Sequence, residues 1–321
     1  MPFLILFFIL IPSIQAQAAP LGPETMLPTG SKESGLDLLE KADRSQKILS
    51  EQLHKLSHSL DSFFGSARID EESKSDSRIR INLISSFRDY SGDSYGANFR
   101  SRIALPRTER RLNIVLQNVS RSFDEDKEGS QPSLGETLQN EDYAAGLRYL
   151  PEISKEWNLG VDTGVKLVLP PDPFIRLRGR RSWWPGLWEI RATGTLFWFN
   201  SRGFGHTESL EFDRQISDSL LFRSENTASW LNVDNEYQFS QSLNFIQRLN
   251  DEWGLLYFLR MSGSNDPVPH AEAYSSGINF RKRIKGNWFY FNIQPAGNWP
   301  RERDFLFVAS LDLKVEVIIG E

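Results

Sequence analysis

The chain has 321 residues, of which 25% are charged, and its formal net charge is −5 at pH 7. A net charge of this sign gives no global cationic field, so nucleic acid is not an expected partner, and 12% aromatic residues exclude a disordered chain. The sequence contains no cysteine, which excludes disulfides, thiol nucleophiles and zinc–thiolate sites.

Residues 1–18 have the pattern of a signal peptide. An apolar stretch over residues 3–11 is followed by Pro12, and Ala16-Gln17-Ala18 offers the small residues of a cleavage site. The stretch is too short to span a bilayer. We therefore predict export with removal of this segment, and an uncleaved N-terminal membrane anchor is the alternative.

Residues 19–34 are rich in Pro, Gly, Ser and Thr and predict a linker. A helical period follows over residues 35–65. Its apolar stripe consists of Leu39, Ala42, Leu49, Leu53, Leu56, Leu60 and Phe63. The spacing predicts one amphipathic periplasmic helix, either a short coiled coil or a helix docked on or inside the next domain. Residues 66–77 are charged and polar and predict a second linker.

From residue 78 onward, apolar residues alternate with polar ones, which is the period of a half-buried strand. We predict strands at about 79–89, 96–105, 111–121, 142–150, 157–169, 173–180, 187–199, 205–214, 220–231, 236–248, 254–263, 271–282, 287–296 and 304–318. Strands without intervening helices predict an antiparallel meander. The fold class is therefore all-β, with about 14 strands and a range of roughly 12 to 16.

A meander of this size forms either a soluble sandwich or a transmembrane barrel. Many runs last about nine to twelve residues, which is long enough to cross a bilayer at a tilt. The 9 tryptophans lie at strand ends or in turns, where the aromatic girdles of membrane barrels lie. We therefore predict a transmembrane antiparallel up-and-down β-barrel over residues 78–321, preceded by one amphipathic α-helix.

Three segments of this predicted barrel carry a resemblance to known proteins. They are the hairpin RIALPRTERRLNIVL, the segment PPDPFIRLRGRRSW and the final stretch WFYFNIQPAGNWPRERDFLFVASLDLKVEVIIG. Through them, most of residues 60–320 resembles an uncharacterised group of proteobacterial outer-membrane β-barrel proteins. The resemblance implies a barrel in the bacterial outer membrane, and it implies no activity.

If the apolar residues face lipid, their charged neighbours face the lumen, because an Arg or Lys in midplane lipid costs roughly 2–4 kcal/mol. The candidate ligand-binding residues of the lumen are Arg80, Arg100, Arg102, Arg148, Arg176, Arg178, Arg180 and Arg191, with Glu189, Glu211 and Asp213. The wider inward set adds Arg88, Lys166, Arg223, Arg248, Arg260 and Arg281, with Asp162, Glu225, Glu272, Asp312 and Glu316. Arginine suits paired carboxylates across strands, or anionic ligands such as phosphate and carboxylate.

Two functions fit such a barrel. The first is a non-enzymatic pore or transport-associated protein whose Arg-rich lumen favours anionic solutes. The alternative is a structural or assembly barrel in which an ion-pair lattice fills a closed lumen. In that case residues 36–63 bind a periplasmic protein, and the helix could also plug the lumen. Outer-membrane lipid and the barrel assembly machinery are the further expected partners, and no cofactor is expected.

An enzymatic function needs a positioned nucleophile and base. His206 and Ser209 are the local candidates for a lipid-modifying enzyme, but on a strand they point to opposite faces. His54 and His58 lie four residues apart on the helix, a spacing that is compatible with a metal but is usually just solvated. We therefore predict no catalytic residues and no metal site, and keep a lipid-modifying enzyme as the third alternative.

Overall fold

In the computed structural model of the chain, the described residues are 51–64, 77–89, 92–105, 112–120, 141–151, 157–233 and 235–320. They all belong to one compact unit, Asp43–Glu321. The predicted signal peptide, the linker over 19–34, the first half of the predicted helix and most of the linker over 66–77 lie outside the described residues. Within the described ranges, no helix is both long enough and apolar enough to span a membrane.

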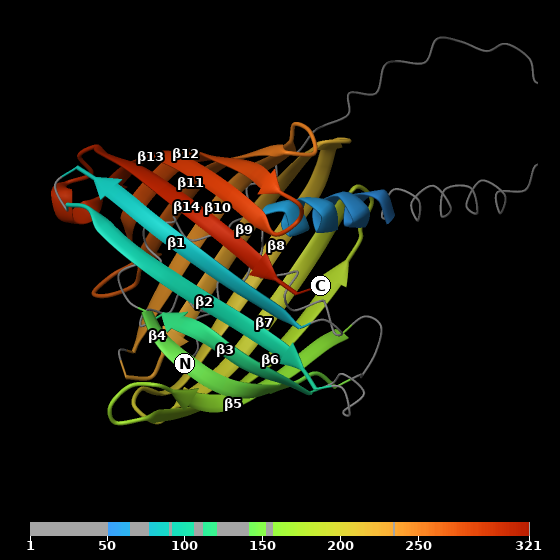
Figure 1. Ribbon diagram of the computed structural model, residues 1–321. Helices are drawn as coiled ribbons and strands as arrows, with labels where there is room; N and C mark the ends of the chain where they lie inside the picture. Colours follow the sequence, from blue (N-terminus) through green and yellow to red (C-terminus); the bar gives the residue numbers. More distant parts are fainter. Residues whose placement is uncertain are drawn as a thin grey trace, which may run out of the picture. The chain divides into compact units, whose positions relative to one another are not determined.

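A closed antiparallel barrel forms the body of this unit (Figure 1). Each strand pairs with its neighbours in the sequence, and β1 closes the barrel on β14 from Ile79↔Ile319 to Arg88↔Ser310. The strands are β1 Arg78–Arg88, β2 Ser94–Ala104, β3 Leu112–Ser120, β4 Glu141–Tyr149, β5 Trp157–Lys166, β6 Asp172–Trp183, β7 Trp188–Phe199, β8 Gly203–Ser217, β9 Leu220–Leu231, β10 Glu236–Arg248, β11 Trp253–Ser264, β12 His270–Lys285, β13 Phe289–Pro300 and β14 Val308–Ile319. The predicted fold class and strand number are confirmed.

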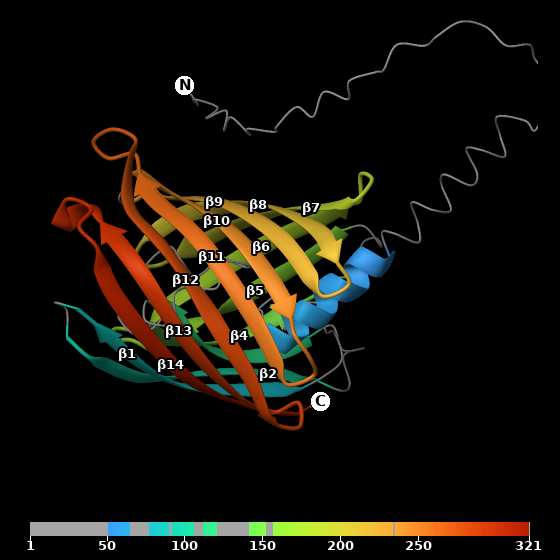
Figure 2. The same ribbon diagram turned by 90° about the horizontal axis from the view of Figure 1, so that it is seen from above.

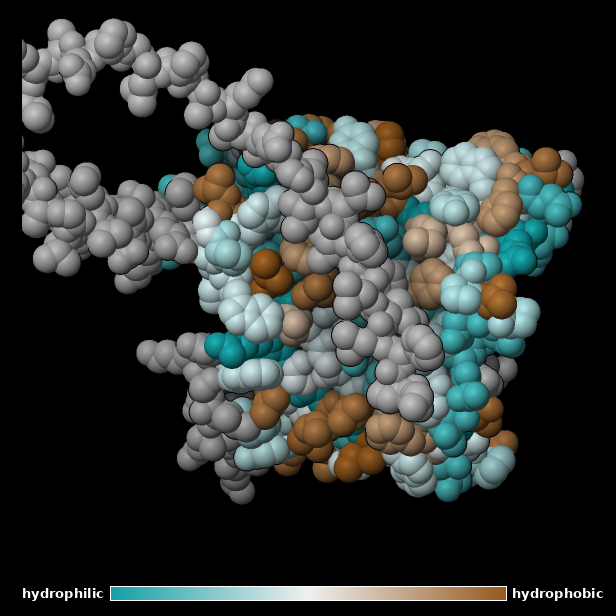
Figure 3. Space-filling view, turned by 180° about the vertical axis from the view of Figure 1, so that it is seen from behind, coloured by the Kyte–Doolittle hydropathy of each residue, from teal (hydrophilic) through white to brown (hydrophobic). Residues whose placement is uncertain are grey.

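Alternation along each strand separates an apolar outer face from a polar inner face. On β7, Arg191, Thr193 and Thr195 are buried inside, whereas Leu196 and Trp198 are exposed outside. Hydrophobic side chains accordingly spread over the outer face shown in Figure 3. Such a face suits lipid, because a closed barrel leaves no unpaired strand edge in the hydrocarbon.

The tryptophans form two belts near the rims of this outer face. We call the rim where β1 begins and β14 ends the proximal rim, and the opposite rim the distal rim. The proximal belt contains Trp157, Trp183, Trp184, Trp188, Trp253 and Trp288, and the distal belt contains Trp198, Trp230 and Trp299. Cations lie over several proximal rings, for example Arg181 above Trp157 and Trp183 at 5.5 and 5.4 Å. This is the arrangement of aromatic girdles at a membrane–water interface.

The predicted start of the last strand at residue 304 was wrong, because β14 begins at Val308. A short 3-10 helix, η3 (Arg301–Arg303), follows β13, and Asp304 and Phe305 then take φ angles of 54° and 57°. Positive φ at two successive residues is incompatible with strand geometry. The alternating apolar residues Phe305 and Phe307 therefore belong to the turn and not to the strand.

One helix, residues 51–64, is seen beside these strands and lies against the inner wall at the proximal rim (Figures 1 and 2). Its buried side chains Leu53, Leu60, Phe63 and Phe64 form one hydrophobic cluster with inward residues of the barrel. The predicted amphipathic helix is confirmed over these residues, and of the open alternatives the structure has the helix docked inside the barrel.

Candidate functional site

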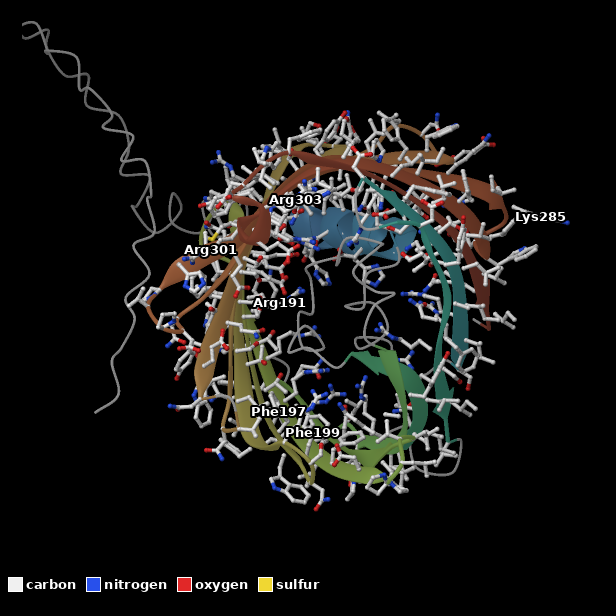
Figure 4. The ribbon with its side chains drawn as sticks, turned by 90° about the vertical axis from the view of Figure 1, so that its left-hand side faces the viewer. Arg191, Phe197, Phe199, Lys285, Arg301 and Arg303 are labelled. Atoms are coloured by element: carbon white, nitrogen blue, oxygen red, sulfur yellow. The ribbon has the colours of Figure 1, made fainter. Side chains whose placement is uncertain are left out.

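The predicted lumen residues differ in their degree of burial. Buried positions on the inner wall are occupied by Arg80, Arg102, Arg148, Arg176, Arg180, Arg191, Glu189, Glu211 and Asp213. Arg178 is half-buried and Arg100 is exposed. Arg191 lies on the inner side of the wall in the view along the barrel, whereas Lys285 points away from it (Figure 4). Glu272, also expected inside, is exposed and lies at the register shift opposite Ser262/Gly263.

Asp162 of β5 joins the arginines of two neighbouring strands. Arg148 of β4 donates from Nε and Nη2 to its two carboxylate oxygens, each at 2.8 Å. Arg176 of β6 donates from Nε at 3.2 Å and from Nη2 at 2.8 Å to Oδ2. The pairing Arg148↔Asp162↔Arg176 is fixed by strand register. Two of the predicted anion-binding arginines are therefore engaged with one protein carboxylate.

Asp162→Asn is expected to lower the free energy of unfolding by roughly 3 kcal/mol, because two buried guanidinium groups then share no counter-charge. The check is the urea midpoint of the refolded barrel in lipid vesicles. Asp218→Asn is the matched control, since Asp218 is exposed in the turn between β8 and β9. Equal midpoints for the two variants would contradict the bridging role of Asp162.

Beside Asp162 the inner wall has a pocket of about 330 Å³, a volume that includes space open to solvent. Its walls are Arg148, Leu150, Asn158, Gly160, Asp162, Arg178 and Arg180, and we call it the arginine cavity. Gly160 pairs with Arg178 and presents no side chain there, and a Cβ at this position would lie 3.4 Å from Leu150 Cδ2. Three arginines and one aspartate give the cavity a positive excess.

Positive charge also exceeds negative charge near the proximal rim of β1 and β14. Glu316 accepts from Arg281 Nη1 at 2.9 Å and lies 3.2 Å from Lys314 Nζ and 3.5 Å from Arg80 Nε. One carboxylate is thus shared by three cations, as Asp162 is shared by two. The wall on this side of the barrel therefore keeps a net positive charge after its ion pairs are formed.

The wall formed by β7, β8 and β9 has the opposite excess. Arg191 lies 2.7 Å from Glu189 and 3.7 Å from Glu211, so one cation serves two carboxylates. Glu225 of β9 stands directly across from Glu211 of β8. Like charges at facing positions repel each other and are found where other groups compensate them. The sequence placed Glu189, Glu211, Asp213 and Glu225 inside among the inward arginines, and strand pairing brings them together on one wall.

The helix rests on an apolar patch of the inner wall, which we call the helix seat. Its wall residues are Leu221, Ile246, Leu256, Phe258 and Tyr290. Phe63 meets the Tyr290 ring edge-on with 6.1 Å between centroids. A Cβ on Gly254 would lie 2.6 Å from Phe63 Cε1, so only glycine permits this approach. Full burial of each Leu or Phe side chain contributes roughly 1.5–3 kcal/mol.

Arg223 connects the helix to the acidic wall. Its Nε and Nη2 donate to Asp213 at 2.8 and 2.7 Å, and its Nη1 and Nη2 donate to Asp61 of the helix at 2.7 and 3.0 Å. Ser57 of the helix accepts from Nη2 at 3.1 Å and donates to Asp213 at 3.0 Å. Arg223, Asp61 and Asp213 are almost completely buried. We call this group the Arg223 clamp.

A signal for the helix seat was present in the sequence. Leu221, Leu256 and Phe258 occupy inward positions, where alternation in a water-filled barrel calls for polar residues. The run GLLYFLR over 254–260 therefore lacks the polar–apolar alternation of the neighbouring strands. Such a run indicates an apolar object inside the barrel, and the amphipathic helix is the element of this chain that provides one.

Apolar side chains also gather inside near the distal rim. Phe174, Phe197 and Phe199 form a second buried cluster with Ala144 and Leu231. Phe197 and Phe199 lie at the inner wall in Figure 4. Lys166 Nζ lies 4.3 Å from the centre of the Phe199 ring, so this cluster too has a cation at its edge.

The histidines show no catalytic arrangement among the described residues. His206 faces outward and packs on Trp230 and Tyr237, with ring centroids 5.7 and 5.9 Å away, whereas Ser209 is buried inside. His206 therefore takes part in aromatic packing on the outer face. His54 and His58 are exposed on the helix. Over the described residues no group of three or more His, Asp or Glu has the geometry of a metal site.

No protein-family model matches this chain, and no curated protein matches its sequence. Among solved structures, the high-pH structure of Pseudomonas putida OprB is similar at 8% identity and TM-score 0.47, covering 80% of this chain and 97% of that one. The outer membrane channel DcaP of Acinetobacter baumannii follows at 9% identity and TM-score 0.42, with 76% and 95% covered. The KdgM porin in complex with disordered oligogalacturonate has 7% identity and TM-score 0.37, with 74% and 98% covered.

Proposed function

We propose that the protein is an outer-membrane pore for small anionic solutes. The observation that carries this proposal is the arginine cavity, where Arg178 and Arg180 line a space beside an Asp162 that is already engaged by Arg148 and Arg176. Solutes bearing a carboxylate or a phosphate suit this wall, because a guanidinium presents its donors in a fork that matches both groups. Leu150 adds an apolar surface for the rest of the solute.

The outer-membrane location is supported by the outer face of the barrel. Leu83, Ile103, Leu177, Leu196 and Leu259 are exposed there, between the two tryptophan belts. Closed barrels with such a band reside in bacterial outer membranes, and outer-membrane lipid and the barrel assembly machinery follow as partners. A cleaved signal peptide over residues 1–18 belongs to the same proposal.

The seated helix favours a second candidate function, a barrel whose closed lumen serves structure or assembly. Four apolar residues of the helix are buried on the wall, so that stripe is occupied by the barrel itself. A periplasmic partner of this chain would therefore have to contact other residues of the 36–63 segment. The ion-pair lattice then acts as filling, and the barrel passes no solute.

Liposome swelling distinguishes the two functions. Vesicles containing the refolded protein and the potassium carrier valinomycin are diluted into isotonic potassium glucuronate, or into isotonic glucose as an uncharged solute of similar size; the carrier lets potassium accompany the anion. We expect the glucuronate vesicles to swell faster, because the inner walls of β1–β6 and β14 carry the positive excess. Failure of a demonstrably folded barrel to admit either solute would favour the closed structural function.

A further inference from the structure

We propose that helix 51–64 is a resident plug that narrows the pore at the proximal rim, and that the Arg223 clamp is the latch that holds it. This inference rests on the proposed pore function and concerns its regulation. Most wall residues of the helix seat lie near the proximal rim: Leu221, Leu256 and Tyr290 are close to the starts of their strands, Ile246 is close to the end of β10, and Phe258 lies midway along β11. The helix therefore occupies one mouth of the barrel.

The helix narrows this mouth and leaves water along part of its surface. Its inner side is buried on the seat, whereas His54, Lys55, His58 and Ser62 are exposed. A helix is about 10–12 Å across with its side chains. The cross-section available to a solute is therefore smaller with the helix seated than with the helix withdrawn.

The Arg223 clamp holds the helix by ion pairs in addition to the apolar contacts of the helix seat. A buried ion pair is weak evidence for stability, because desolvation offsets much of its attraction, and its better supported role is to select one arrangement. Here the guanidinium group of Arg223 donates hydrogen bonds both to Asp213 of the wall and to Asp61 of the helix. If the helix leaves its seat, Arg223 keeps its ion pair with Asp213. The guanidinium group on the wall of the open pore is therefore still paired with a carboxylate.

The other contacts between the helix and the wall are also non-covalent. Arg248 donates to Ser59 at 3.2 Å, and the guanidinium groups of Arg248 and Arg283 lie 5.7 and 5.5 Å from the Phe63 ring. Gly254 provides the space that Phe63 and Phe64 need. A larger residue at this position displaces the helix tip without altering any charge, which gives a second and independent way to unseat it.

Two unseating variants and one control test the proposal in the full-length refolded protein. Asp61→Asn removes the helix side of the latch, and Gly254→Val closes the space for the Phe63 ring. Asp218→Asn is the control, an exposed acid at the same rim. Far-UV circular dichroism and heat-modifiable migration on gels establish that each variant is folded.

Helix position is read by cysteine labelling, which is clean because the chain has no cysteine of its own. Leu53→Cys places a thiol at a buried position of the helix outside the Arg223 clamp, and Ser62→Cys provides an exposed reference on the same helix. We expect Asp61→Asn to raise the maleimide labelling rate of position 53 roughly ten-fold, the effect of losing a hydrogen bond between charged groups. Labelling of position 62 should stay unchanged.

Pore size is read by single-channel conductance of the same variants without the cysteines. Larger openings in Asp61→Asn and Gly254→Val than in wild type and Asp218→Asn support the plug. Faster labelling at position 53 with wild-type conductance overturns the plug and leaves the pore intact. Unchanged labelling in both unseating variants overturns the latch. Silence of every folded variant, including those with an unseated helix, overturns the pore function itself.

Discussion

Arg223→Ala is expected to lower the free energy of unfolding by about 3–5 kcal/mol, the typical cost of breaking a buried ion pair by removing one partner. The variant leaves Asp61 and Asp213 buried beside each other without their shared cation. It also removes the tie between the helix and the acidic wall. The expected result is a lower urea midpoint in lipid vesicles, together with an exposed helix.

Two further variants separate charge from geometry in this prediction. Arg223→Lys keeps the charge but loses the fork that reaches both carboxylates, so its midpoint should fall between wild type and Arg223→Ala. Arg214→Ala is the outward control, because Arg214 stacks on Trp188 at 5.3 Å on the outer face. A midpoint for Arg223→Ala equal to that of Arg214→Ala would show that the clamp does not stabilise the fold.

Replacing Arg178 and Arg180 together by glutamine is expected to reduce the anion-to-cation permeability ratio roughly thirty-fold. A unit charge about 4 Å from a passing ion contributes about 1 kcal/mol in water, so two such charges contribute about 2 kcal/mol, which corresponds to a factor of this size. Both residues line the arginine cavity, whereas Arg176 is bound to Asp162. Arg176→Gln should therefore change selectivity less than either of its two neighbours.

Arg181→Gln is the matched control for selectivity, since Arg181 lies on the same strand but stacks on Trp157 and Trp183 outside the barrel. The measurement is the reversal potential of single channels under a salt gradient. If Arg181→Gln shifts that potential as much as the double variant, the effect is not located in the lumen, and the arginine cavity is not the selective site.

The fold was predictable because alternation is a local property of each strand. In a strand, successive side chains point to opposite faces, so the position of Arg191 between the apolar residues Ile190 and Ala192 is enough to place it on the polar face. The repetition of this pattern from residue 78 onward indicates a barrel. Turn conformation is less visible in a sequence. The positive φ at Asp304 and Phe305 ends the strand pattern although the apolar residues continue to alternate.

The organisation of the lumen was only partly predictable, because it depends on register between strands. The sequence places Arg176, Arg178 and Arg180 on one face. Strand register gives them different surroundings, because Asp162 stands across from Arg176 whereas Gly160 stands across from Arg178. The Arg223 clamp joins residues 162 positions apart in the chain. No local pattern connects Asp61 to Arg223, although the inward apolar residues of β9 and β11 indicate that something apolar lies inside.

Selectivity of the lumen for anions is measured by the reversal potential of the wild-type protein in a planar bilayer under a tenfold gradient of potassium chloride. We expect steady openings whose reversal potential has the sign of chloride permeation. A reversal potential with the sign of potassium permeation, from a barrel shown to be folded, would contradict this selectivity.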